Sequence, residues 1–278
     1  MQEMFPYDIY LYMQILMLFL TFIIYLVSTL SYSVRIVGVR TGRIAVAFAV
    51  FNIFALISRS AGSIQSPLLT KKIESNIING SPDDLTNLFR LLLLASTIAA
   101  IVGALLIPTF IKIFTRGVES FSIHKSIPRL IMHSISKSGI EQFKKSITIP
   151  QSYNFEHMKN FKRIPRRIVL LNAAAFSMST VGSLAALYAG ARYPEFRTTC
   201  NSLSFIINMF STLIMFIFVD PYVSIMTDDV IKGDCSHADF DRCIVFLVAG
   251  LIVGTMAAQL LLVPAAEIIR FVAEWVPS

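Results

Sequence analysis

Charged residues are absent from six long segments of this chain, and this spacing constrains its fold more than any other feature. Five of the segments are 21 to 26 residues long: 9–34, 91–111, 168–191, 198–219 and 243–266. A helix needs about 20 apolar residues to cross the hydrocarbon core of a bilayer, and only a helix satisfies its backbone groups within one such segment. The spacing therefore predicts an all-α polytopic membrane protein with six transmembrane helices.

The composition agrees with a membrane protein and excludes a soluble domain. Hydrophobic residues make up 55% of the chain and charged residues only 15%, with a mean hydropathy of +0.68. Soluble domains have roughly a quarter of their residues charged. The net charge of +7 does not indicate a nucleic-acid partner, because membrane proteins concentrate Lys and Arg in cytoplasmic loops. Three cysteines are too few for a disulfide framework.

The distribution of Lys and Arg predicts the orientation of the six spans. If both termini lie outside, the loops that face the cytoplasm carry 17 basic residues and the outer segments carry 7. Because cytoplasmic loops are enriched in basic residues, we expect both termini outside. The aspartate-rich loop 220–242 favours the opposite orientation, so a minority of inverted or dual-topology molecules is the alternative.

The spans form two sets of three with similar loop lengths, which predicts a 3+3 inverted-topology repeat. The first membrane unit is 1–111, the second is 168–278, and a basic cytoplasmic segment, 112–167, joins them. Since each set has an odd number of helices, the second enters the membrane from the opposite side. Transporters built in this way bind their substrate between the two halves. Chance similarity between apolar segments is the alternative.

The joining segment carries twelve basic and three acidic residues, with apolar residues at roughly helical spacing. This pattern predicts amphipathic interfacial helices that lie on the anionic lipids of the inner leaflet. Docking of a partner protein is the alternative.

A pair of small residues in the last span, Gly250 and Gly254, has the GxxxG spacing. Small residues at this spacing let two helix backbones approach closely. The approach occurs either within one subunit or, as the alternative, across a homodimer interface.

The best candidate for a substrate-binding residue is Arg59, which follows a segment of only 15 uncharged residues. That segment is too short for a span, so its helix must continue past Arg59 or be broken. Small and polar neighbours, including Gly62 and Gln65, surround the arginine, and Pro67 is expected to interrupt the helix. A polar, interrupted span is typical of a broken helix that lines a cavity. The alternative is that Arg59 snorkels to the interface.

Five further polar residues are candidates for substrate contacts. Arg35, Arg40 and Arg43 cluster just after the first span, on the side that we expect to face the cytoplasm. There they either anchor the topology or bind an anion. Asn52 and Asn208 lie in mid-span, where a polar side chain needs a hydrogen-bond partner. A neighbouring helix or a ligand could supply that partner.

Catalytic chemistry is poorly supported by the sequence. It holds no G-x-S-x-G, HExxH or Walker A motif and no paired carboxylates within a span. The segment 233–243 gathers Cys235, His237, Asp239, Asp241 and Cys243, but it lacks the paired spacings of structural zinc sites. We expect a solvated acidic loop there, with a metal site or a disulfide as alternatives. The sequence therefore predicts no enzyme, no cofactor and no metal.

The block 29–69 reads TLSYSVRIVGVRTGRIAVAFAVFNIFALISRSAGSIQSPLL and resembles the Amj family of bacterial lipid II flippases, the "alternate to MurJ" proteins. The resemblance implies a protein of the bacterial cytoplasmic membrane that moves lipid II, an undecaprenyl-diphosphate-linked peptidoglycan precursor, from the inner to the outer leaflet. A non-transporting scaffold of the cell-envelope synthesis machinery and a membrane enzyme acting on lipid diphosphates are the alternatives.

Transport of such a lipid requires cations for the diphosphate and polar groups for the sugar–peptide head. Arginine suits phosphate because its planar fork donates two parallel hydrogen bonds and stays charged. We therefore expect Arg59 and Arg35 to hold the diphosphate. The remaining candidate substrate-binding residues are Arg40, Arg43, Asn52, Gln65 and Asn208. Without an ATPase motif, transport must run downhill or couple to an ion gradient or to the membrane potential.

Overall fold

The computed structural model describes residues 7–79, 82–124 and 166–276, and the regular elements in these ranges are all helical. They are α1 (Tyr7–Thr41), α2 (Ile44–Asn79), α3 (Pro82–His124), α7 (Arg166–Arg192), the 3-10 turn η3 (Pro194–Phe196), α8 (Arg197–Ile214), the π-helix η4 (Met215–Val219), α9 (Asp220–Lys232) and α10 (His237–Trp275). Six stretches are long and apolar enough to cross a membrane. The predicted all-α fold with six such helices is confirmed. The interfacial helices expected between α3 and α7 lie outside the described residues.

The second span is longer than its uncharged segment and is not broken. Helix α2 continues through Arg59, Gly62 and Pro67 to Asn79, so the expectation that Pro67 interrupts this helix is wrong. Proline is tolerated in membrane helices where neighbouring hydroxyl groups bind the backbone carbonyls near it. The carbonyl that Pro67 leaves without its helical donor is that of Ser63; the Thr70 hydroxyl adds a contact beside the proline by donating to the Ser66 carbonyl over 3.1 Å.

The fifth span also continues beyond the charge at which the sequence predicted its end. Asp220 begins α9 directly after the π-helix η4, and Pro221, which has no N–H to donate, follows it. The predicted loop 220–242 is therefore reduced to a short turn at 233–236. Gly233 closes α9 with a left-handed φ of +85°, and Ser236 caps α10 by accepting a hydrogen bond from the Asp239 amide.

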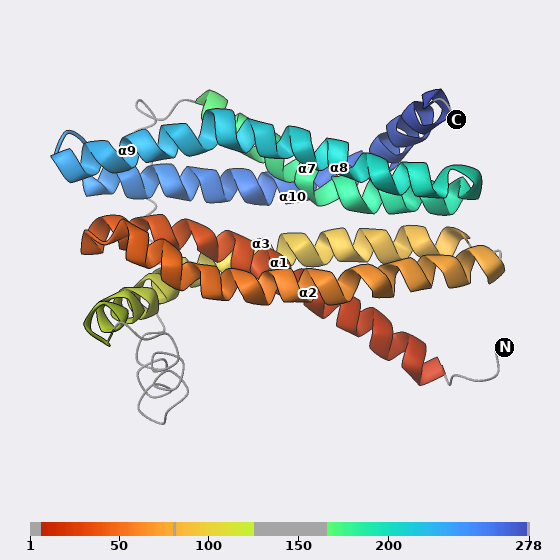
Figure 1. Ribbon diagram of the computed structural model, residues 1–278, viewed down its shortest axis with the longest axis horizontal. Helices are drawn as coiled ribbons and strands as arrows, with labels where there is room; N and C mark the ends of the chain where they lie inside the picture. The colour runs from red at the N-terminus through yellow and green to blue at the C-terminus, as the bar shows by residue number, and fades with distance from the viewer. Residues whose placement is uncertain (1–6, 80–81, 125–165, 277–278) are drawn as a thin grey trace.

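The six spans form two triplets that lie side by side (Figure 1). In the first triplet α1 packs against both α2 and α3, and in the second α7 packs against both α8 and α10. We call the end where α1 begins and α10 ends the terminus end. The opposite end, which holds the turns 42–43 and 233–236, is the loop end. The first triplet starts at the terminus end and the second at the loop end, which is the arrangement that a 3+3 inverted repeat requires.

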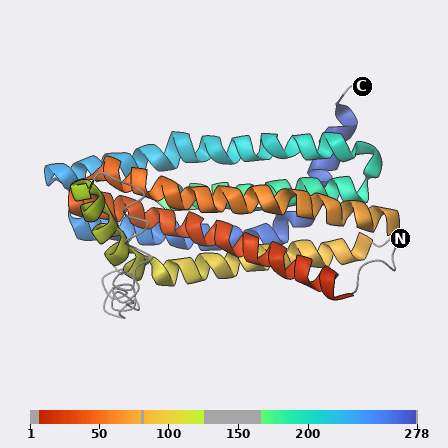
Figure 2. The same ribbon diagram turned by 60° about the horizontal axis from the view of Figure 1, so that its bottom comes forward.

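Two buried apolar clusters connect the triplets along their shared face. One cluster joins Met17 and Phe89 of the first triplet to Ala185 and Leu262 of the second. The other cluster joins Tyr32 of α1 to several residues of α9 and α10. The helices on the far side of this face, α2 and α8, do not pack against each other along their lengths in the described ranges (Figure 2).

The small residues of α10 serve packing within the subunit. A Cβ placed on Gly250 would lie 3.0 Å from the Val169 carbonyl oxygen of α7, and one placed on Gly254 would lie 2.5 Å from that of Ala173. Both glycines are buried. The alternative that this pair forms a homodimer contact is therefore wrong, because α7 of the same chain covers it.

We expect Gly254→Ala to lower the thermal stability of the purified protein in detergent. The added methyl group has no room between α10 and α7, and overpacking of a helix contact costs roughly 1–3 kcal/mol. The matched control is Gly117→Ala on α3, where a Cβ would meet no atom within 4 Å. Since alanine favours a helix over glycine by about 1 kcal/mol, this variant should unfold at the same or a higher temperature. Equal melting temperatures for the two variants would contradict the packing described above.

Candidate functional site

One side of α2 carries a polar stripe that does not pack against its own triplet. The stripe consists of four exposed residues: Asn52, Arg59, Ser63 and Ser66. Their spacings of seven, four and three residues place them on one side of a helix with 3.6 residues per turn. Because most large polar groups inside membranes face a partner or an aqueous path, this exposed stripe is the primary candidate for a substrate site.

A contact beyond the Ser66 end of the stripe places this side of α2 toward the second triplet. Ser63 precedes Glu74 by three helical turns, and Glu74 pairs with Arg197 of α8 at 3.0 Å. Phe48 precedes Arg59 by three turns, and its ring lies 5.8 Å from the guanidinium of Arg35. Residues three turns apart share a side of the helix. The Ser66 end of the stripe therefore lies on the side of α2 turned toward α8. Beyond its Asn52 end, this side of α2 contacts Arg35 of α1, which in turn pairs with Asp220 of the second triplet.

Helix α8 carries polar residues with the same spacing as the first three residues of the α2 stripe. Asn201, Asn208 and Thr212 are separated by seven and four residues, and the first and last of them are exposed. Asn208 is half-buried, and its Oδ1 atom lies 3.1 Å from the position that a Cβ would take at Gly182. Its side chain thus rests against α7, in agreement with the helix-contact role considered for it from the sequence.

In the described part of the chain, ion pairs connect the two triplets at both the loop end and the terminus end. At the loop end, Arg35 pairs with Asp220 at 2.6 Å and Arg40 pairs with Asp241 at 2.6 Å. At the terminus end, Arg197 pairs with Glu74 at 3.0 Å. The direction of charge is reversed between the ends, because the first triplet supplies the arginines at the loop end and the carboxylate at the terminus end. All of these side chains are 21 to 47% exposed, and pairs accessible to water typically contribute only about 0.2–1 kcal/mol.

The arginines predicted from the sequence occupy three different environments. Arg35 and Arg40 bind carboxylates of the second triplet, whereas Arg43 is exposed in the turn between α1 and α2. Arg59 is exposed near the middle of α2, and among the described residues its guanidinium has no hydrogen-bond or ion-pair partner. Arg59 is therefore available to an anion without the loss of an existing contact.

The predicted amides also differ in their surroundings. Asn52 lies on the α2 stripe and is exposed. Gln65 lies on the opposite side of α2, where its amide donates to the Met17 carbonyl at 3.1 Å and to the Thr21 hydroxyl of α1. In this structure Gln65 joins α2 to α1, and it does not lie with Asn52 and Arg59.

A buried polar contact between the triplets was not singled out by the sequence. The Tyr32 hydroxyl donates to Asn172 Oδ1 at 2.9 Å, and the Asn172 amide donates to the Leu247 carbonyl at 2.7 Å. Asn172 is fully buried. Through its two partners, Tyr32 of α1 and Leu247 of α10, this residue of α7 holds the three helices against one another at the loop end.

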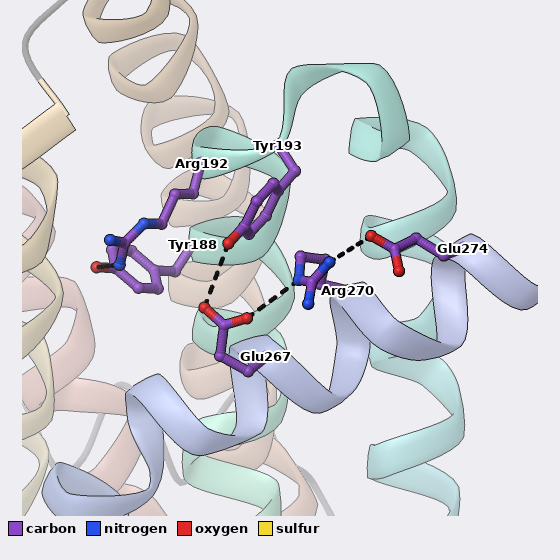
Figure 3. Close-up of polar contacts among 6 residues, drawn as sticks. All are labelled: Tyr188, Arg192, Tyr193, Glu267, Arg270 and Glu274. Carbon is purple, nitrogen blue, oxygen red and sulfur yellow. Dashed lines mark hydrogen bonds and ion pairs between the residues drawn. The ribbon is translucent and has the colours of Figure 1, made fainter.

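A second polar cluster lies at the terminus end, where α10 bends away beyond Pro264 (Figure 3). Arg270 donates to Glu267 at 3.1 Å and also contacts Glu274. Its guanidinium lies 5.1 Å from the centre of the Tyr193 ring, and the Tyr193 hydroxyl donates to Glu267 at 3.4 Å. These contacts lie within the second triplet, so the cluster fastens the end of α10 to the turn before α8.

The segment 233–243 forms ordinary helix-capping and ion-pair contacts. Asp239 accepts from Arg242 at 3.1 Å, and Asp241 binds Arg40. In the described ranges, no group of three or more His, Cys, Asp or Glu side chains could hold a metal ion. Cys235 and Cys243 are not joined to each other, and Cys243 is buried.

Comparison with known proteins identifies the family. The family described as "Alternate to MurJ" (Amj) matches residues 20–273, which extends from within α1 to the end of α10. The chain belongs to the Amj family. A relative from Bacillus subtilis (strain 168), named lipid II flippase Amj, is 33% identical over 260 residues, which cover 91% of this chain and 94% of the relative. No solved structure matches the chain.

The Amj match covers both triplets and the contacts between them. The matched range includes the α2 stripe, the polar residues Asn201, Asn208 and Thr212 of α8, and the ion pairs described above. In this Amj family member, the side where α2 and α8 face each other combines an unpartnered cation with neutral amide and hydroxyl groups. Such a surface can bind an anion that also carries many hydroxyl and amide groups.

Proposed function

We propose that this protein is a lipid II flippase, which moves an undecaprenyl-diphosphate-linked peptidoglycan precursor from the inner to the outer leaflet of the bacterial cytoplasmic membrane. Family membership and the name of the Bacillus subtilis relative support this function. The structural observation that carries it is the exposed, unpartnered Arg59 on the side of α2 that faces α8.

The chemistry of the diphosphate matches the environment of Arg59. An arginine in the middle of a membrane helix costs about 2.5–3.5 kcal/mol on insertion scales, and a partner of opposite charge offsets that cost. A diphosphate accepts two parallel hydrogen bonds from the guanidinium fork, and such charge-assisted bonds are among the strongest in proteins. In this proposal Arg59 holds the diphosphate in mid-membrane, while the polyprenyl tail stays in lipid beside α2 and α8.

The other predicted residues have distinct parts in the proposal. Arg40 and Arg43 attract the anionic lipid to the loop end, near Arg35. Asn52 and Asn208 form hydrogen bonds with the sugar–peptide head on either side of Arg59. Gln65 lies on the opposite side of α2 and holds this helix against α1, which fixes the position of the stripe.

The orientation is part of the same proposal. With both termini outside, the loop end lies in the cytoplasm, where lipid II is made, and the basic segment before α7 meets the anionic lipids of the inner leaflet. Assembly as a homodimer would enlarge the polar path. The buried Gly250 and Gly254 are excluded from such an interface, because α7 covers them.

The orientation predicts which engineered cysteines a membrane-impermeant maleimide labels in intact cells, in a Cys235→Ser background. Glu195→Cys at the terminus end should be labelled, and Asp234→Cys at the loop end should be labelled only after permeabilisation. Both positions are exposed, so accessibility alone does not separate them. Equal labelling in intact cells would indicate dual topology, and the reverse pattern would place the termini inside.

Arg59→Ala should reduce the flipping of fluorescent lipid II in proteoliposomes at least tenfold, and Arg59→Lys should restore only part of the activity. Lysine keeps the charge but lacks the two-pronged donor geometry. The fraction of lipid II in the outer leaflet is followed by dithionite quenching, with the amount of reconstituted protein measured in the same vesicles. Full activity of both variants would show that Arg59 only anchors α2 at the interface.

A matched control keeps the composition and moves only the cation. The double variant Arg59→Ser/Ser60→Arg carries the same residues, and both positions are exposed, but it turns the guanidinium by about 100° around α2. Our proposal expects this variant to be as inactive as Arg59→Ala. If it flips lipid II at the wild-type rate, the side of α2 that bears the charge does not matter and the assignment of the stripe is wrong.

A further inference from the structure

The ion pairs Arg35–Asp220 and Arg197–Glu74 lie at opposite ends of the α2 stripe, and each joins one triplet to the other. We infer that Arg35 and Arg197 are the uptake and release sites for the diphosphate, and that Asp220 and Glu74 occupy these arginines when the lipid is elsewhere. This inference rests on the proposed flippase function. It assigns a substrate role to Arg197 and a gating role to two carboxylates.

The positions of the two pairs along α2 fit the two surfaces of a membrane. Phe48, which lies beneath Arg35, and Glu74, which binds Arg197, are both on α2. At a rise of 1.5 Å per residue they are about 39 Å apart, and a bilayer with its headgroup layers is about 40–45 Å thick. Arg59 lies between them, about 16 Å from Phe48 and about 22 Å from Glu74 along the helix. The three arginines thus form an uptake, a middle and a release site.

At both ends, an arginine that binds a carboxylate of the other triplet can bind the lipid diphosphate in its place. Each arginine leaves one anion and binds another, so no unpaired guanidinium is created. The displaced carboxylates can be hydrated, since Asp220 and Glu74 are 32 and 40% exposed, and Glu74 also lies 3.9 Å from Lys71. Carboxylate and phosphate both match the planar fork of arginine. Both pairs are also partly exposed, with side chains between 21 and 40% accessible. A lipid diphosphate that arrives from either leaflet can therefore reach the arginine.

The contacts of the neighbouring arginines at the terminus end distinguish Arg197 from them. Arg192 donates to the Tyr188 hydroxyl at 3.2 Å, and Arg270 binds Glu267 and Glu274, so both are held within the second triplet (Figure 3). Arg197 instead binds Glu74 of the first triplet. Binding of a diphosphate to Arg197 therefore also breaks the ion pair between α2 and α8. The two helices then separate near the terminus end, and the lipid leaves between them.

The test compares two variants that break the same ion pair but leave different charges behind. Arg197→Gln removes the cation, and Glu74→Gln removes only the carboxylate. If Arg197 binds the diphosphate, Arg197→Gln should slow the flipping of fluorescent lipid II in proteoliposomes at least tenfold. Glu74→Gln removes the anion that competes for Arg197 and should flip lipid II faster than the wild type. A tenfold change corresponds to about 1.4 kcal/mol. Arg35→Gln and Asp220→Asn form the equivalent pair at the loop end.

Thermal unfolding of each variant provides the control for folding. Both variants at the terminus end lose the Arg197–Glu74 contact, and Glu74→Gln also loses a 3.9 Å contact with Lys71. Since exposed ion pairs contribute little to stability, both should unfold at similar temperatures, and Arg197→Lys should recover part of the flipping rate. Equal rates for Arg197→Gln and Glu74→Gln, or a slower Glu74→Gln, would overturn the inference and leave the pair as a structural contact. A wild-type protein that does not flip lipid II would instead contradict the proposed function itself.

Discussion

The hydrocarbon core of a bilayer penalises every polar group that lacks a partner, and the arrangement of this protein depends on that penalty. This penalty restricts the membrane-spanning segments to helices, because only helices satisfy their own backbone groups in lipid. It also explains why Tyr32 and Asn172 meet in the interior and why carboxylates accompany the arginines that join the triplets. Against this background Arg59, whose guanidinium has no partner among the described residues, points to a ligand from outside the chain.

The two triplets provide a rigid side and a less constrained side. On the rigid side, α3, α7 and α10 share buried apolar clusters, and close approach at Gly254 locks α10 to α7. On the other side, α2 and α8 meet through the Arg197–Glu74 pair near one end. A movement that separates α2 from α8 therefore breaks an exposed ion pair, and near the terminus end it also moves Leu69 and Ile73 of α2 away from a buried apolar cluster that includes Leu203 of α8. The reversed charge direction of the pairs at the two ends fits this arrangement, in which each triplet holds one gate carboxylate.

The sequence predicts the number of spans and the inverted arrangement of the triplets, because both follow from charge spacing and an odd number of helices. Its errors lie at the helix ends. Asp220 was taken as the end of a span, but a π-helix accommodates the following Pro221 and α9 continues. Pro67 was taken as a break, but α2 passes through it. Charge spacing shows where charged residues occur in the sequence. It does not show whether the helix ends at such a residue or continues past it.

The sequence predicts the candidate site only in part, because side-chain pairing depends on which helices become neighbours. Arg59 and Asn52 lie on one stripe, as their spacing on α2 allows. Gln65 has the same polar character but turns toward α1. The partners of Arg35 and Arg197 are 185 and 123 residues away in the chain, and no local pattern reveals them.

The central claim is that the head group of the lipid moves along the side of α2 that faces α8, and photo-crosslinking tests it most directly. A photoreactive phenylalanine analogue is placed at Ser63, on the stripe, or at Ile64, which is also exposed but turned by about 100° around the helix. With radiolabelled lipid II in proteoliposomes, position 63 should capture the head group, and position 64 should capture only bulk phospholipid and polyprenyl chains. Equal capture of the head group at both positions, or stronger capture at 64, would contradict the account.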